Sequence, residues 1–89
     1  MLKAKKSRKK LNRVEEKPLI GDVLKQLRID RKLSQIELAR ISGLTGAAIC
    51  NYEQGIRIPK LFSFNVICKA LEADMVVLLN TCSLVTKKL

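Results

Sequence analysis

The segment from residue 34 to residue 55, SQIELARISGLTGAAICNYEQG, constrains the fold more than any other part of the chain. Ser34 is a favourable N-cap and Glu37 completes a capping box, so a helix should begin here and end before Gly43. Thr45 is the N-cap of a second helix, which the glycine at the end of the segment terminates. The sequence therefore predicts two short helices joined by a glycine turn.

Apolar spacing predicts one helix before this segment and another after it. From Leu19 to about Lys32, apolar residues recur three and four positions apart, which indicates one buried stripe. Pro59 suits the first turn of a later helix, in which the same spacing continues to Leu71. Only three residues are aromatic, so the core must be aliphatic, which suits short helices packed on one another. We expect one all-α domain over residues 19–72.

The segment ADMVVLLN, residues 73–80, is compatible with two structures. Adjacent valines with apolar residues on both faces favour a strand, whereas Asp74 is also a suitable cap for a short fifth helix. We favour the strand, and its expected partner is the same segment of a second copy, because an unpaired strand leaves its N–H and C=O groups without partners. Residues after Thr81 are expected to form a frayed tail. The predicted dimerisation residues are Met75, Val76, Val77, Leu78 and Leu79.

The chain has a formal net charge of +10, and a surface this basic attracts phosphate polymers or anionic lipid. Residues 1–18 hold eight Lys or Arg against two Glu and so supply six of these ten charges. Repulsion within a segment that has few apolar side chains predicts a disordered tail. The tail has no aromatic side chains and few aliphatic ones to serve as anchors, which argues against membrane binding.

Composition also excludes several classes of protein. No apolar run approaches the ~20 residues of a membrane span, and no apolar signal region follows Met1, so we expect a soluble, cytoplasmic protein. The three cysteines are far apart and the chain has no histidine, which argues against zinc. Cys50 and Cys68 are interpreted as small buried side chains. Without histidine, paired acidic residues or a glycine-rich phosphate loop, we predict neither an enzyme nor a cofactor.

Two short helices joined by a glycine turn within a helical domain are typical of the helix-turn-helix, whose second helix enters the major groove of DNA. Three elements, LRIDRKLSQIELARISGLT, ICNYEQG and a proline followed by LFSFNVICKAL, resemble the lambdoid-repressor and Cro-like, XRE-type helix-turn-helix proteins. The resemblance covers residues 23–79. Within this family, ICKALEADMVVLL is most similar to HipB-type antitoxins. The resemblance implies a lambda-repressor-like fold of four or five helices, with a C-terminal β-strand that pairs across a dimer.

The resemblance also implies a role for each matched position. Arg28 and Glu53 would form an interior ion pair that ties the first helix to the third. The positions implied to contact DNA bases are Thr45, Gly46, Ala47 and Asn51, and those implied to contact phosphates are Ser34, Gln35, Arg57 and Lys60.

This chain departs from the family at Gly46 and Ala47, where the family usually has Gln, Arg, Ser or Thr. Neither residue has a side-chain donor or acceptor. The second helix can therefore approach the bases closely, with Ala47 available for a thymine methyl group, while hydrogen bonding to base edges falls mainly on Asn51, which suits adenine. We expect much of the affinity to come from phosphates and much of the selectivity from groove shape.

We therefore predict a homodimeric, sequence-selective repressor that binds a palindromic DNA operator, with half-sites about 34 Å apart or a multiple of that spacing. The similarity to HipB implies a second role as an antitoxin with a kinase-like toxin as partner. The basic tail either solubilises the chain or acts as an arm on the DNA. The competing hypothesis is a protein-binding adaptor with a vestigial motif, which uses Ile36, Ile41 and Val66 as an exposed contact surface.

Overall fold

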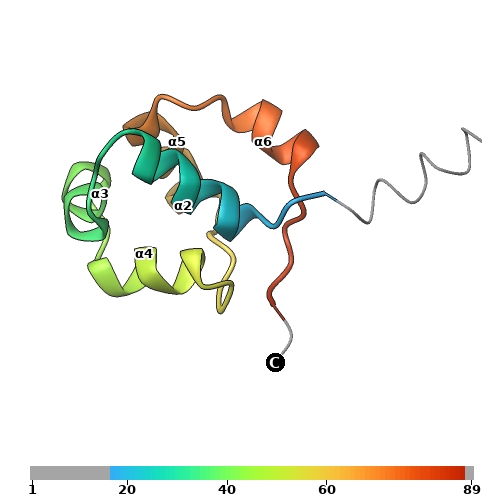
Figure 1. The fold of residues 1–89 in the computed structure, drawn as a ribbon, viewed down its shortest axis with the longest axis horizontal. Coiled ribbons are helices and arrows are strands. Elements are labelled where there is room, and N and C mark those ends of the chain that lie inside the picture. Colours follow the sequence, from blue (N-terminus) through green and yellow to red (C-terminus); the bar gives the residue numbers. More distant parts are fainter. Residues whose placement is uncertain (1–16, 88–89) are drawn as a thin grey trace, which may run out of the picture.

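The computed structural model describes residues 17–87, and within this range the fold consists of α-helices with one isolated β-bridge, between Leu19 and Ser83 (Figure 1). The helices are α2 (Ile20–Asp30), α3 (Gln35–Ser42), α4 (Gly46–Glu53), α5 (Leu61–Leu71) and α6 (Met75–Thr81). The predicted all-α class is confirmed. The predicted disordered tail falls on residues 1–16, which lie outside the described residues, and on Lys17 and Pro18. None of the helices in the described range is long and apolar enough to cross a membrane.

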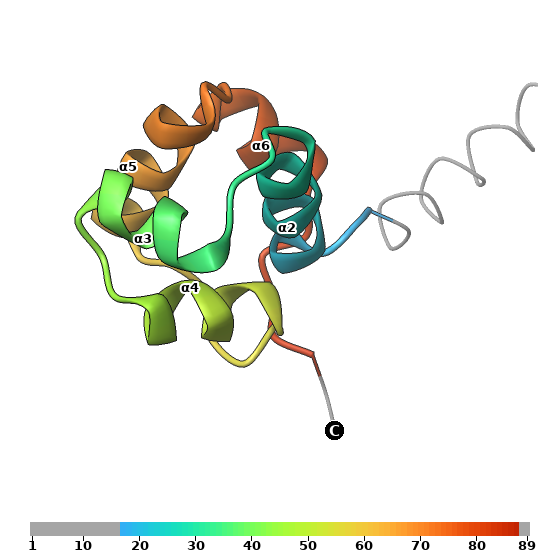
Figure 2. The same cartoon turned by 60° about the vertical axis from the view of Figure 1, so that its left-hand side comes forward.

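The helices enclose one small core. Helix α3 packs against α4 and α5, α2 packs against α4, and α6 packs against α5 (Figures 1 and 2). Every helix contributes to this core, whose buried members are Ile20, Leu24, Leu38, Ala39, Ile49, Phe64, Ile67, Cys68, Leu71, Leu78 and Cys82. Burial raises the pKa of the Cys68 thiol to about 11, and nearby Asp74 and Cys82 add to the effect. This thiol is therefore protonated at neutral pH, as a small core side chain.

The predicted caps of α3 and α4 are confirmed. Glu37 N–H donates to Ser34 Oγ at 3.0 Å and Ser34 N–H donates to Glu37 Oε1 at 2.8 Å, which completes the capping box. Thr45 Oγ1 accepts a hydrogen bond from Ala48 N–H at 3.0 Å. Gly43 and Gly55 have left-handed φ angles of 75° and 77°, which glycine adopts without strain. These local signals fix where both helices begin and end.

Helix α5 begins slightly later than predicted. Its first residue is Leu61 and its N-cap is Lys60, so Pro59 lies just before the helix and not in its first turn. Pro59 is buried there. It has no N–H to donate, and ahead of the helix this costs no helical hydrogen bond.

The predicted C-terminal strand is wrong, because residues 75–81 form helix α6. Asp74 Oδ1 accepts hydrogen bonds from the N–H groups of Val76 and Val77 at 2.9 and 3.3 Å. A helix satisfies its backbone groups within the segment, whereas an unpaired strand would leave them unsatisfied, and this outweighs the β-propensity of the two valines. Of the predicted dimerisation residues, Leu78 is buried and Met75 is half-buried, while Val76, Val77 and Leu79 are exposed.

The predicted frayed tail after Thr81 is also wrong. Cys82 is buried, and beyond it the chain runs back past the start of α2 towards the loop that follows α4 (Figure 1). Ser83 N–H donates to Pro18 O at 2.8 Å, and Ile20 N–H donates to Ser83 O at 3.0 Å. The first N–H groups of a helix have no partner inside the helix, so Ser83 supplies one that α2 lacks.

Candidate functional site

Helix α4 faces the core with one side only. Ile49 and Glu53 on that side are buried, whereas Thr45 and Ala47 on the other side are exposed and Asn51 is half-buried. In Figures 1 and 2, α4 lies along one edge of the molecule, with no other helix outside it. The outer side of α4 therefore presents small side chains and one amide to an incoming partner.

A shallow hollow runs along this outer side. Its volume is about 230 Å³, and the residues that line it are Thr45, Ala47, Ala48, Asn51, Tyr52 and Arg57. The α4 hollow brings three of the four predicted base-contacting residues together with one predicted phosphate-contacting residue, Arg57.

The loop after α4 places Arg57 at this hollow. The N–H groups of Ile56 and Arg57 donate to Asn51 O at 3.0 and 3.3 Å, so the loop folds back onto the last turn of the helix. Gly55, with its φ of 77°, makes this reversal possible. Arg57 is exposed, and it is the one basic residue among the described residues that line the hollow.

A buried ion pair holds α4 against α2. Arg28 Nε lies 2.6 Å from Glu53 Oε2 and Arg28 Nη2 lies 3.0 Å from Glu53 Oε1, with side-chain exposures of 11% for Arg28 and 2% for Glu53. Arg28 Nη1 also donates to Leu33 O at 2.7 Å, in the turn before α3. The hydrogen bonds to Glu53 raise the pKa of Arg28 further above its ordinary value. The ion pair expected between these two residues is therefore present.

Gln35 joins this interior pair. Its Nε2 donates to Glu53 Oε1 at 2.9 Å, so the first residue of α3 is fixed relative to α4. One amide N–H of Gln35 is engaged inside the protein, and within residues 17–87 its second N–H and its Oε1 have no hydrogen-bond partner. Ser34 and Lys60, the other predicted phosphate-contacting residues, are exposed at the N-caps of α3 and α5 and do not line the hollow. Their contacts with DNA stay predictions.

Packing within the described residues does not require glycine at position 46. A Cβ at this position would meet only Ile36 Cγ1, at 3.9 Å, which is an ordinary contact. At Gly21, in contrast, a Cβ would lie 2.2 Å from Tyr52 O, so α2 approaches the end of α4 too closely for any side chain. The free protein therefore requires glycine at position 21 and does not require it at position 46.

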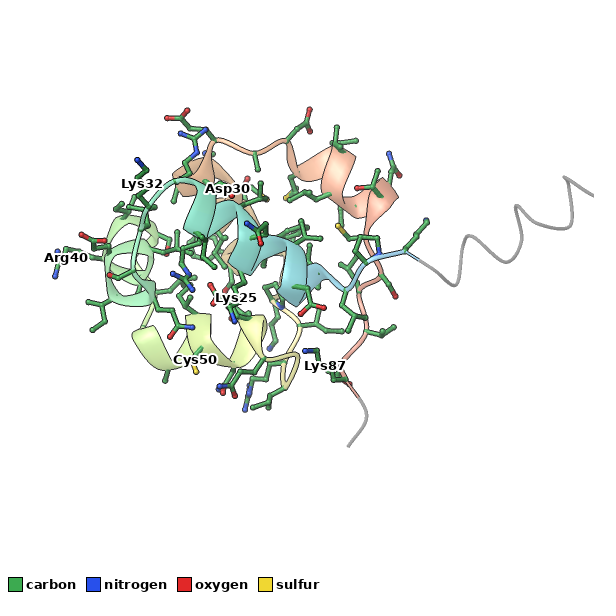
Figure 3. All side chains as sticks on the ribbon, in the orientation of Figure 1. Lys25, Asp30, Lys32, Arg40, Cys50 and Lys87 are labelled. Carbon is green, nitrogen blue, oxygen red and sulfur yellow. The ribbon has the colours of Figure 1, made fainter. Side chains whose placement is uncertain are left out.

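Sequence reasoning missed two residues of the hollow. Ala48 and Tyr52 line it, although neither is among the residues that the resemblance implies to contact DNA. Helical spacing contained the signal, because Ala48 follows Thr45 by three positions and Tyr52 follows Ala48 by four. Cys50, labelled in Figure 3, is half-buried, so its interpretation as a buried side chain is wrong.

The predicted adaptor surface is only partly exposed. Ile36 and Ile41 on α3 have exposed fractions of 65% and 58%, as their positions in the helix predict. Val66 on α5 is half-buried, so the expectation that it is exposed is wrong. The two exposed isoleucines lie on a different helix from the hollow.

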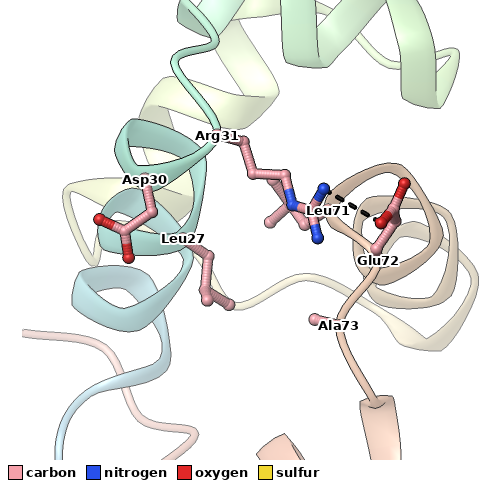
Figure 4. Close-up of a pocket in the computed structure, with 6 residues that line it drawn as sticks. All are labelled: Leu27, Asp30, Arg31, Leu71, Glu72 and Ala73. Atoms are coloured by element: carbon pink, nitrogen blue, oxygen red, sulfur yellow. Dashed lines mark ion pairs between the residues drawn. The ribbon is translucent and has the colours of Figure 1, made fainter.

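A second pocket, with a larger volume of about 410 Å³, lies between the end of α2 and the α5–α6 turn (Figure 4). It is lined by Leu27, Asp30, Arg31, Leu71, Glu72 and Ala73. Arg31 Nη1 and Glu72 Oε1 form an ion pair across it at 3.0 Å, and the exposed fractions of the two side chains are 42% and 71%. The two charges compensate each other, which leaves Asp30 as the remaining charged group of the lining.

Comparisons with known proteins identify a helix-turn-helix in the same part of the chain. The sequence pattern of the helix-turn-helix family matches residues 24–78, which is more than half of the chain. The restriction-modification controller protein C.AhdI from Aeromonas hydrophila is 32% identical, with 64% of this chain and 86% of that chain covered and a TM-score of 0.62. No curated protein sequence matches the chain.

Two further solved structures are similar. The wild-type restriction-modification controller protein C.Esp1396I is 30% identical, with 68% of this chain and 79% of that chain covered and a TM-score of 0.62. The P22 c2 repressor, solved in complex with a synthetic operator, is 25% identical, with 67% of this chain and 91% of that chain covered and a TM-score of 0.65. Two of these three relatives are restriction-modification controller proteins, and the third is a repressor bound to an operator.

Proposed function

The chain belongs to the helix-turn-helix family, and from this membership we propose that it is a sequence-selective DNA-binding regulator of transcription that acts as a repressor. One observation carries the proposal. The outer side of α4, the second helix of the motif, combines small side chains and the amide of Asn51 with the guanidinium of Arg57. A net charge of +10 adds a long-range attraction for DNA.

In this proposal α4 enters the major groove. Thr45, Gly46 and Ala47 approach the base edges closely, and Ala47 contacts a thymine methyl group. Asn51 makes the main hydrogen bonds to a base, with adenine as its best partner. The phosphate contacts come from Ser34, Gln35, Arg57 and Lys60, and they fix the position of α4 without reading sequence.

We propose that the DNA-binding form is a homodimer. Val76, Val77 and Leu79 on α6 have exposed fractions of 61%, 50% and 40%, so this short helix presents an apolar side to solvent. A second copy placed against it by a two-fold axis would bury these side chains and bring two α4 helices to one duplex. Such a dimer binds a palindromic operator with half-sites about 34 Å apart or a multiple of that spacing.

The antitoxin role is not part of this proposal. The similarity to HipB-type antitoxins included a C-terminal strand that pairs across a dimer, and α6 takes the place of that strand. The kinase-like toxin partner depended on the same similarity. Regulation of transcription through DNA requires neither.

The experiment that tests the proposal is a selection of bound sites from random DNA, with the spacing of any half-sites measured. We expect an enriched palindrome whose half-sites are one helical turn apart or a multiple of it. An adaptor with a vestigial motif would enrich no sequence and would bind random DNA weakly at near-physiological salt. That result would favour Ile36 and Ile41 as a protein-binding surface instead.

Substitution of Asn51 tests which residue reads the bases. Asn51→Ala should weaken binding to the selected site by ~1 to 3 kcal/mol and leave binding to random DNA nearly unchanged. Asn65→Ala is the matched control, because Asn65 is half-buried like Asn51 but lies on α5, outside the lining of the hollow. Equal losses on both kinds of DNA would show that Asn51 reads no base.

A further inference from the structure

The chain after α6 is attached at two separate places. The first is the start of α2, where Ser83 forms a β-bridge with Leu19. In this bridge Ser83 N–H donates to Pro18 O, and Ser83 O accepts from Ile20 N–H. Cys82 is buried next to this bridge, and Leu84 packs against the core. These contacts fix the direction in which residues 82–87 leave α6.

The second attachment is to the loop after α4. Lys87 N–H donates to Gly55 O at 2.9 Å, and a Cβ at Gly55 would lie 2.7 Å from Lys87 Cγ, so the lysine stem covers this glycine. Lys87 Nζ lies 3.4 Å from Asp22 Oδ1 on α2. In Figure 3, Lys87 lies beside the loop that follows α4. Gly55 is buried in this arrangement.

The glycine that Lys87 covers begins the loop that carries Arg57. Gly55 is followed by Ile56 and Arg57, whose N–H groups both donate to Asn51 O. Asn51 and Arg57 line the hollow on α4. A continuous set of contacts therefore runs from α6, through residues 82–87, to the backbone of Asn51 and Arg57, two of the residues that line the hollow.

We propose that residues 82–87 form a C-terminal strap that positions the Gly55–Arg57 loop, with Lys87 as the positioning residue for Arg57. This inference rests on the proposed function, because it assigns the strap a role in the affinity of the same DNA-binding site. The strap acts through the backbone hydrogen bond to Gly55 and the packing of the lysine stem. The exposed ion pair with Asp22 contributes little, as surface ion pairs do.

The alternative role for Lys87 is electrostatic, as one more positive charge near the DNA. Two variants separate the roles. A chain ending at Leu84 loses the attachment to Gly55 together with the charges of Lys87 and Lys88. The variant with Lys87→Met and Lys88→Met loses the same two charges but keeps the backbone hydrogen bond and an unbranched stem over Gly55.

Hydrogen exchange on the free protein gives the first measurement. The Ile56 and Arg57 amides should exchange about fivefold faster or more in the chain ending at Leu84, the factor that corresponds to one ordinary hydrogen bond. They should exchange at the original rate in the double Met variant. Thermal unfolding shows whether the shortened chain is folded. If it is not, Lys87→Pro, which removes the N–H donor at full chain length, takes its place.

Affinity for the selected DNA site gives the second measurement. Both variants should lose affinity through charge, and the shortened chain should bind about fivefold more weakly than the double Met variant. Original exchange rates in the shortened chain, or equal affinities of the two variants, would overturn the strap. If the unmodified chain bound no DNA, the proposed function would fail, and exchange would still decide whether the strap holds the loop.

Discussion

At the scale of single residues, glycine occurs in two helices for different reasons, at position 21 in α2 and at position 46 in α4. Gly21 is required by the fold, because the carbonyl of Tyr52 occupies the space of a side chain. Gly46 has open space around it, yet glycine in a helix costs up to about 1 kcal/mol relative to alanine. A residue that lowers stability without a packing reason is best explained by close approach of the bound partner.

Gly46→Ala should therefore separate stability from binding. We expect the free energy of unfolding to rise by up to about 1 kcal/mol, measured by chemical denaturation. Affinity for the selected DNA site should fall, because the new methyl group lies on the side of α4 that approaches the bases. Gly21→Ala is the contrasting variant and should be destabilised by about 1 to 3 kcal/mol or more. Unchanged DNA affinity in Gly46→Ala would remove position 46 from the interface.

The buried ion pair gives a second prediction at this scale. Glu53→Gln removes the charge that faces Arg28 inside the protein and should lower the free energy of unfolding by about 3 kcal/mol, as breaking a buried pair does. Glu72→Gln is the control, because it breaks the exposed pair with Arg31 and should cost less than about 1 kcal/mol. Equal losses in the free energy of unfolding for the two variants would show that the burial of Glu53 does not increase the cost of breaking its ion pair.

Part of the site could be predicted from the sequence at this scale. The resemblance implied the pair of Arg28 and Glu53, since both residues match positions of a known motif. It did not imply that Gln35 donates to Glu53, because that bond depends on how three helices meet. Ala48 was missed because alanine has no functional group to draw attention, although its spacing from Thr45 placed it on the same side of α4.

At the scale of helices, prediction succeeded where the signal was local. The caps of α3 and α4 are set by neighbouring residues, such as the Ser34 and Glu37 pair, so spacing alone located them. Residues 75–81 were wrongly predicted as a strand, because whether this segment forms a strand or a helix depends on whether a second strand is available to pair with it. The strap was missed because its bonds to Pro18 and Gly55 join residues that are distant in sequence.

The capping box makes the stability of α3 depend on pH. Hydrogen bonds from Ser34 lower the pKa of Glu37 below its ordinary value. A carboxyl group with a lowered pKa stabilises the fold above its ordinary pKa of about 4.3, and this contribution is lost as the pH falls through the folded-state value. Glu37→Gln should therefore be less stable than the original chain near pH 7, and the difference should shrink below about pH 4. Unfolding curves between pH 2.5 and 7 test this, and a constant difference would contradict it.

At the scale of the whole molecule, the exposed side of α6 decides the assembly. Val77→Asp places a charge on that side without disturbing the core and should shift the protein towards monomers in sedimentation experiments. It should also weaken binding to a two-half-site operator more than binding to a single half-site. Ile29→Asp is the matched control, because Ile29 is similarly exposed but lies on α2. A dimer that survives Val77→Asp unchanged would place the interface elsewhere.

The charge of the whole chain gives the last prediction. Residues 1–16 hold seven Lys or Arg and two Glu, so their deletion removes half of the net charge of +10. If this segment lies along DNA, the slope of log affinity against log salt should flatten by about 0.9 for each phosphate that it neutralises. A full-length variant with the seven basic residues changed to Ser separates charge from length and should give the same slope as the deletion. An unaltered slope in both variants would mean that the helical domain alone makes the salt-dependent contacts, with Arg57 and Lys60 as the nearest candidates.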